Sequence, residues 1–234
     1  MEKENRMILS DRLQTIADLI GEGCRIADIG TDHGYLPIYL LQQKKPAFVA
    51  ACDINRGPLE HAQRSAAQYG LEHSMSFRLG NGLACIDPNE VDTIIIAGMG
   101  GETIAAILEA APWTNSSAYR MILQPMTKVE FLRPWLAERG YVIEEERLVY
   151  ENRTYFPVLS VRGGGERSKL TLGQTWGGVA LDRDPLQQQA LSETIRHLQY
   201  ALSGLEKSSL PENTRRAQQH REIIRQLESM KEEL

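Results

Sequence analysis

Two carboxylates, a histidine and two glycines share one short segment of this sequence. The segment "ADIGTDHGYLP" (residues 27–37) contains Asp28, Gly30, Asp32, His33 and Gly34. Acids and histidines can act as an acid/base pair or as metal ligands, whereas glycines let the backbone approach a bound molecule closely. No third ligand follows at a recognisable metal-binding spacing, so we expect no metal here. The remaining readings are a cofactor cradle and a simple tight turn.

The spacing of the two glycines bears on the kind of cofactor. Gly30 and Gly34 form GxxxG, which lacks the middle glycine of the GxGxxG motif that holds a pyrophosphate. A ligand without phosphate that passes over the turn is better supported. S-adenosylmethionine carries an ammonium and a sulfonium, and Asp28, at the expected strand end, suits its amino-acid part.

A second acid stands where a nucleoside would need it. Asp53 lies 23 residues after Gly30, at the end of the next expected strand. An acid at this position accepts hydrogen bonds from ribose hydroxyls in nucleotide-binding sheets, although it can also cap the following helix. Asn81 and Gly82 follow the third expected strand, where an adenine edge would lie, although Asn-Gly is also a favoured turn. Together these residues predict a cofactor that contains adenosine.

The expected elements place these residues at one rim of a sheet. Strand-like runs at 24–29, 47–54, 74–80, 91–98 and 119–125 alternate with helical runs, which indicates a parallel sheet covered on both faces. The runs 141–151 and 154–163 are joined too closely for anything but an antiparallel pair. This order predicts an α/β fold of the Rossmann-like, class I methyltransferase type, with a seven-stranded mixed sheet. "AGMGG" (97–101) follows the fourth strand and "QPM" (124–126) ends the fifth, both at the ligand-binding rim.

The last third of the chain has a different character. A Gly-rich stretch from Gly163 to about Asp182 reads as a linker or docking segment. Beyond it, apolar residues recur at spacings of three and four in two runs, and Ser209 is positioned to cap the second helix. We expect a methyltransferase domain over 1–163, then a linker and a coiled-coil-like two-helix hairpin over 164–234. The two apolar runs comprise Leu191, Ile195, Leu198, Leu202 and Leu205, then Ile223, Leu227, Met230 and Leu234.

Composition excludes several classes of protein. The chain has 234 residues, 42% of them hydrophobic, and no apolar run approaches the roughly 20 residues that a membrane span needs. The polar N-terminus favours a cytoplasmic protein, and three cysteines without a CxxC pair fit reduced thiols. A net charge of −5 argues against non-specific coating of nucleic acid but allows a local basic face. Candidates for such a face are Arg6, Arg12, Lys128, Arg133, Arg153, Arg215, Arg216, Arg221 and Arg225.

An ordered set of motifs resembles one family. "LSDRLQTIADLI", "ADIGTDHGYLPIYL", "ACDINRGPLEHA", "AGMGGETI" and "ILQPM" are together similar to the bacterial tRNA adenine-22 N1-methyltransferases, known as TrmK. The resemblance implies methyl transfer from S-adenosylmethionine to N1 of an adenine near the tRNA D-arm, with Met99 and Gly100 beside the methyl group. The cofactor residues it implies are Asp28, Gly30, His33, Gly34, Asp53, Ile54, Asn81 and Gly82, and we add Gly98 from the glycine-rich rim.

The chemistry of N1 sets what the enzyme must do. N1 offers an in-plane lone pair, so alignment with the methyl–sulfur bond matters more than a strong base. The base has to leave its stack, and we expect Asp32, Tyr35 and the AGMGG backbone to hold it. The absence of a DPPY or NPPY tetrapeptide, typical of amino-group methyltransferases, fits a ring nitrogen. A nicotinamide oxidoreductase and a binding module of degenerate activity remain as alternatives, and the oligomeric state stays open, with a monomer favoured.

Overall fold

The computed structural model describes residues 6–181, 184–208 and 210–234. A seven-stranded sheet in the order β3-β2-β1-β4-β5-β7-β6 forms its centre. The first five strands are parallel, and β7 is antiparallel to both β5 and β6. The predicted mixed sheet with an antiparallel terminal hairpin is therefore confirmed. The strands are β1 (Arg25–Ile29), β2 (Phe48–Asp53), β3 (Ser76–Leu79), β4 (Thr93–Gly100), β5 (Arg120–Thr127), β6 (Val142–Glu151) and β7 (Thr154–Arg162).

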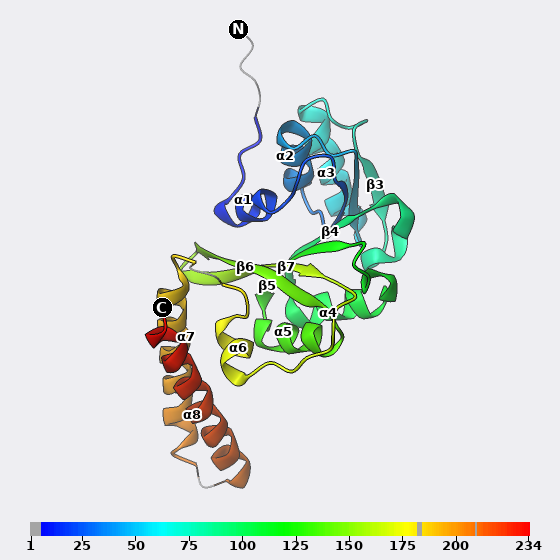
Figure 1. Cartoon of the computed structure of the whole chain (residues 1–234). Coiled ribbons are helices and arrows are strands. Elements are labelled where there is room, and N and C mark those ends of the chain that lie inside the picture. The colour runs from blue at the N-terminus through cyan, green and yellow to red at the C-terminus, as the bar shows by residue number, and fades with distance from the viewer. Residues whose placement is uncertain (1–5, 182–183, 209) are drawn as a thin grey trace.

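Helices cover both faces of this sheet (Figure 1). Alternate residues of the central strands face opposite sides: Ile26 and Ile95 pack toward α1 and α2, whereas Ile94 and Ile96 pack toward α4 and α5. All four are fully buried, which is why these strands read as continuous apolar runs. The helices around the sheet are α1 (Asp11–Asp18), α2 (Tyr35–Gln43), α3 (Arg56–Gln68), α4 (Gly101–Glu109) and α5 (Val129–Glu138). Three short 3₁₀ helices also connect the strands: η1 (Gly82–Cys85), η2 (Pro88–Glu90) and η3 (Pro112–Thr114).

The predicted C-terminal hairpin is present and projects from the sheet beside β6 (Figure 1). Helices α7 (Gln187–Leu205) and α8 (Pro211–Glu232) pack through Leu191, Ile195 and Leu198 of the first against Ile223 and Leu227 of the second. Ser209, expected as the cap of α8, lies outside the described residues. Leu234 was expected in the apolar contact, and this was wrong: its side chain is largely exposed because α8 ends at Glu232.

The Gly-rich stretch is more than a linker. It contains a short helix, α6 (Leu172–Gly177), which begins with a capping box between Thr171 and Gln174. Gly173 and Gly177 face α8 so closely that a Cβ on Gly177 would stand 2.8 Å from Leu227. The glycines that read as flexibility in the sequence therefore allow close packing of α6 against the hairpin.

A buried ion pair connects this helix to the sheet. Arg133 of α5 and Glu146 of β6 are almost fully buried, and Nη2 of Arg133 lies 2.8 Å from Oε2 of Glu146. Nη1 of Arg133 donates to the carbonyls of Thr175 and Trp176, and Oε1 of Glu146 accepts from the backbone N–H of Val179. Arg133 was expected among the residues that could contact RNA phosphates, and this was wrong, because its guanidinium is buried and bonded to groups inside the protein.

We predict that Arg133→Ala lowers the free energy of unfolding by about 3–5 kcal/mol, because it leaves the Glu146 carboxylate buried without its partner. Urea denaturation measures this loss. Arg147→Ala is the matched control, since the Arg147–Glu145 pair is partly exposed and should contribute no more than about 1 kcal/mol. The double variant Arg133→Met/Glu146→Gln should recover part of the lost stability; equal effects of the two single arginine variants would contradict the prediction.

Candidate active site

The turn after β1 is fixed by backbone geometry. Gly30, Asp32 and Gly34 all have positive φ, and the N–H groups of Gly30 and Thr31 both donate to the carbonyl of Cys52 at 2.9 Å. A Cβ on Gly34 would lie 3.0 Å from Cβ of Ala62 in α3. The two glycines of the sequence motif are thus required by backbone conformation and by the close approach of α2 to α3.

Asp53 ends β2 with its carboxylate already oriented. The side chain is buried, Oδ1 accepts from the N–H of Asn55 at 2.8 Å, and Oδ2 accepts from the N–H of Asp32 at 3.4 Å. Asp32 therefore contributes its backbone to the turn, while its own side chain points largely into solvent and lies 3.7 Å from Nε2 of His33. Ile54, immediately after Asp53, is exposed.

Asp28 is a buried carboxylate close to a second acid. The residue is only 5% exposed, and burial raises its pKa from 3.8 to about 6; the Thr31 side chain opposes this rise and the neighbouring Asp53 charge adds to it. A buried carboxylate of this kind gains most from a cationic partner. The sequence indicated an ammonium-binding role for Asp28, and its environment is one in which an ammonium group would be stabilised.

A cavity of about 590 Å³ opens beside these residues. Asp28 and Gly30 lie on one part of its wall, and Ala97 and Gly98 of β4 on another. The sequence analysis assigned no part in the site to the segment before α1 or to Glu151, because neither contains the glycines or strand-end acids that indicate a cofactor site. The lining residues are Ile8, Leu9, Ser10, Arg12, Leu13, Asp28, Gly30, Thr31, Asp32, His33, Tyr35, Leu36, Ala97, Gly98 and Glu151.

Residues 97–100 of the AGMGG segment belong to β4 and Gly101 begins α4, so β4 continues two residues beyond its expected end at Gly98. The pairing with β5 is irregular from Ala97 to Gly100, and Gly98 has a φ of 77°. Gln124 of β5 is fully buried and accepts from the N–H of Gly98 at 3.1 Å. The QPM segment was expected to help hold a base, but the Gln124 side chain instead stabilises the irregular part of β4. Met99 approaches the first turn, with its Cε 2.4 Å from where a Cβ on Gly30 would stand.

Asn81 and Gly82 lie apart from this cavity, whereas His33 and Tyr35 line it. Asn81 and Gly82 line a second cavity, of about 450 Å³, with Ile107 and Trp113 among its other residues. His33 stacks on Tyr35, with ring centroids 5.2 Å apart and planes inclined by 14°, and His61 lies at the same centroid distance from His33. Tyr35 is partly exposed at the cavity and presents an aromatic surface there.

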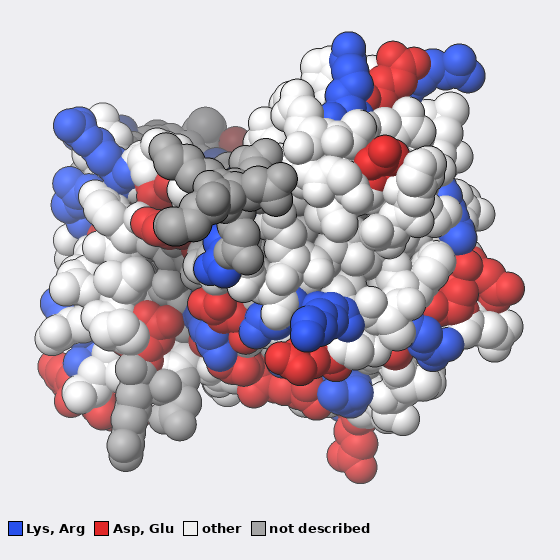
Figure 2. All heavy atoms as spheres, turned by 90° about the horizontal axis from the view of Figure 1, so that it is seen from above, with Lys and Arg blue, Asp and Glu red and all other residues white. Residues whose placement is uncertain are grey.

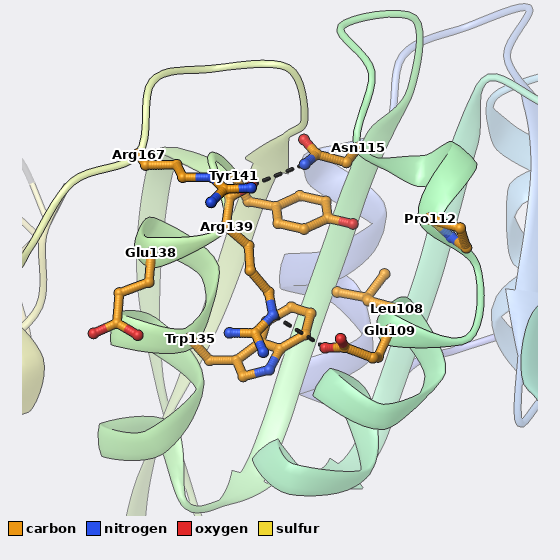
Figure 3. Close-up of a pocket in the computed structure, with 9 residues that line it drawn as sticks. All are labelled: Leu108, Glu109, Pro112, Asn115, Trp135, Glu138, Arg139, Tyr141 and Arg167. Carbon is orange, nitrogen blue, oxygen red and sulfur yellow. Dashed lines mark hydrogen bonds and ion pairs between the residues drawn. The ribbon is translucent and has the colours of Figure 1, made fainter.

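A third cavity, of about 510 Å³, lies at the opposite end of the sheet (Figure 3). It is formed where α4 and α5 end, and these ends face away from the carboxyl ends of the strands. Arg139 spans it by stacking on Trp135, with Cζ 4.3 Å from the ring centroid, and by pairing with Glu109 at 3.0 Å. Asn115 donates to the Arg139 carbonyl. Arg139, Glu109 and Asn115 are therefore engaged with one another inside this cavity.

The charges around the molecule are mixed. Figure 2 shows Lys and Arg interspersed with Asp and Glu on the face it presents, without a continuous field of one sign among the residues drawn in colour. Several expected basic contacts are engaged within the protein: Arg12 with Glu151, Arg221 with Glu206, and Arg225 with Glu222. Lys128 and Arg153 are exposed and have positive φ.

No helix in 6–181, 184–208 or 210–234 has the length and apolar character to cross a bilayer. The same residues contain no group of three or more His, Cys, Asp or Glu side chains that could hold a metal ion.

Comparison with known proteins identifies the class and then the family. A family model described as a methyltransferase domain matches residues 9–159, so the sheet and its rim cavity define a methyltransferase domain. The chain is 32% identical to the tRNA (adenine(22)-N(1))-methyltransferase of Bacillus subtilis over 97% of this chain and 98% of that protein. It belongs to the tRNA (adenine(22)-N(1))-methyltransferase family.

Solved structures agree with this assignment. The crystal structure of the B. subtilis m1A22 tRNA methyltransferase TrmK matches with a TM-score of 0.85 at 30% identity, over 97% of this chain and all of that chain. M. capricolum TrmK, solved in complex with the natural cofactor product S-adenosyl-homocysteine, matches with a TM-score of 0.75 at 30% identity, over 96% and 98% of the two chains. The hairpin of α7 and α8 is included in these matches, since they span nearly the whole chain.

We predict that Asp28→Asn stabilises the ligand-free protein at pH 8. A carboxyl whose pKa is raised on folding destabilises the folded state above that pKa and has no such effect below its unfolded value, so the gain should be on the order of 2–3 kcal/mol at pH 8 and should shrink as pH falls from about 6 toward 4. Denaturant midpoints of variant and wild type at pH 5 and pH 8 measure it. A variant that is equally or less stable at pH 8 would show that Asp28 is not penalised by burial.

Proposed function

We propose that this protein transfers the methyl group of S-adenosylmethionine to N1 of adenine 22 in the D-arm region of tRNA. One observation supports the proposal: a cavity at the carboxyl ends of β1 and β4 is lined by the buried Asp28 and by the turn that follows it. The chain around it is 32% identical to the B. subtilis tRNA (adenine(22)-N(1))-methyltransferase over nearly its full length. Open α/β sheets bind ligands at this place.

The residues present fit the methyl donor. Asp28 faces the ammonium of the amino-acid part, and Asp53, already oriented by two backbone N–H groups, accepts the ribose hydroxyls. Gly30 and Gly34 keep the turn free of side chains that would fill the cradle. His33 and Gly98 would hold the donor from the cavity wall, and Ile54, Asn81 and Gly82 would hold its adenine, with Asn81 and Gly82 lining the second cavity. When bound, S-adenosylmethionine supplies an electrophilic methyl group on a sulfonium.

The remaining wall of the cavity serves the target base. Tyr35, stacked on His33, provides an aromatic face against which an extruded adenine can lie. Asp32, at the exposed side of the cavity, would contact the base, and Met99 and Gly100 would confine the reacting groups from the β4 side. The protein's task is then to hold N1 in line with the methyl group and to exclude water, which is catalysis by orientation.

Assembly and location follow from this activity. Residues of one chain form the whole cavity, so a monomer suffices. We assign catalysis to residues 1–163 and contact with the tRNA body to the hairpin region, residues 164–234, with exposed Lys128 and Arg153 adding phosphate contacts beside the first domain. Because tRNA is the substrate, we place the enzyme in the cytoplasm.

We predict that Asp53→Asn and Asp28→Asn separate the two halves of the donor site. Asp53→Asn should weaken both S-adenosylmethionine and 5′-methylthioadenosine by about 10-fold or more, since both carry the ribose. Asp28→Asn should weaken S-adenosylmethionine alone, because the smaller ligand lacks the ammonium. Titration calorimetry gives both constants; normal binding of both ligands by Asp53→Asn would refute the ribose assignment.

The transfer reaction itself is tested with labelled S-adenosylmethionine and unmodified tRNA, followed by mapping of the methylated base. We expect label at N1 of adenine 22 and none in a tRNA with guanine at that position. Donor binding without transfer to tRNA would instead favour a binding module of degenerate activity. Binding of a nicotinamide cofactor in place of the methyl donor would favour an oxidoreductase.

A further inference from the structure

Glu151 is the last residue of β6 and reaches the cavity from the far edge of the sheet. β6 and β5 are both antiparallel to β7, so they run in the same direction and β6 ends at the same rim as β1 and β4. Glu151 lines the cavity together with Gly98 and Tyr35, and it belongs to a different strand from Asp28 and Asp53. Glu151 is therefore an acid of the cavity to which the proposed donor site assigns no role.

The contacts of Glu151 hold it in place without satisfying it. Oε2 lies 3.5 Å from Nε of Arg12, yet it is a buried atom without a hydrogen-bond partner among the described residues. Arg12 directs its hydrogen bond elsewhere: Nη1 donates at 2.8 Å to Oε1 of Gln124, which also accepts from Gly98. Arg12 thus positions the carboxylate while being anchored to the β4 bulge.

The chemistry of the reaction calls for an acceptor at such a position. The N1 lone pair forms the new bond to the methyl carbon while the methyl–sulfur bond breaks, and its electron pair remains on sulfur. The positive charge moves from the sulfonium to the purine, where it spreads over N1, C6 and the N6 amino group. A carboxylate beside N6 interacts more strongly with the transition state than with the neutral base, which accelerates the step.

We propose that Glu151 is a catalytic residue that accepts a hydrogen bond from the N6 amino group of the target adenine and stabilises the charge that develops on the ring. The proposal rests on the proposed function. Asp32 is the competing acid, but its side chain is 69% exposed, whereas that of Glu151 is 27% exposed. The better shielded carboxylate interacts more strongly with a charge in the cavity.

The first test is Glu151→Gln, which preserves shape and removes the charge. We expect kcat for tRNA methylation to fall about 10- to 100-fold, while the Kd for S-adenosylmethionine and the thermal midpoint stay within error. Glu145→Gln is the matched control: it lies on the same strand and pairs with Arg147, away from the cavity, and should keep wild-type activity. Wild-type kcat in Glu151→Gln, or an equal loss of donor binding, would overturn the proposal.

The second test removes the partner group from the substrate. A tRNA with purine ribonucleoside in place of the target adenosine lacks the N6 amino group, so the ratio of wild-type to Glu151→Gln rates should fall from about 10–100 to within about threefold of one. An unchanged ratio would show that Glu151 acts on protein structure and would overturn the proposal. Absence of methylation of the ordinary tRNA by the wild type would instead refute the proposed function.

Discussion

The site depends on one constraint: after the paired strands β1 and β4, the chain turns to opposite faces of the sheet. The chain leaves β1 through α2 on one face of the sheet and leaves β4 through α4 on the other, so no connection crosses the gap between their carboxyl ends. Side chains and turns at this gap face an opening that the fold itself cannot fill. Asp28, Asp53 and Gly98 come from three different strands and meet there because parallel strands end at the same rim.

Acidic side chains around this opening are individually unfavourable for the empty protein. Asp28 is buried next to another carboxylate, and Glu151 holds an oxygen that no hydrogen bond satisfies within the described residues. Such groups persist where a ligand compensates them. A cationic donor and a base that becomes cationic are the two molecules that this arrangement of charge would select.

The sequence was most informative where function depends on local geometry. Alternating strands and helices, the glycines at positive φ and the acids at strand ends could all be placed from the sequence because each has a short-range physical cause. Residues whose roles depend on distant partners were missed. From the sequence, Arg133 resembles an exposed basic residue, but in the structure it is buried and pairs with Glu146, 13 positions later. Gln124 contacts Gly98, and Glu151 contacts Arg12, only because β5 and β6 bring them together. The helix α6 was hidden for the same reason, since its glycines serve packing against α8.

The ion pair of Arg133 and Glu146 makes the C-terminal hairpin inseparable from the sheet. Carbonyls of Thr175 and Trp176 and the N–H of Val179 complete the coordination of both charges, and the glycine face of α6 is in turn covered by Leu227 and Met230 of α8. Excising α7 and α8 would uncover that glycine face and loosen the groups that neutralise the pair. A chimera that exchanges hairpins between relatives must therefore also transfer α6 and the α5 and β6 residues that contact it. The segment that can be exchanged as a unit is larger than the α7–α8 hairpin alone.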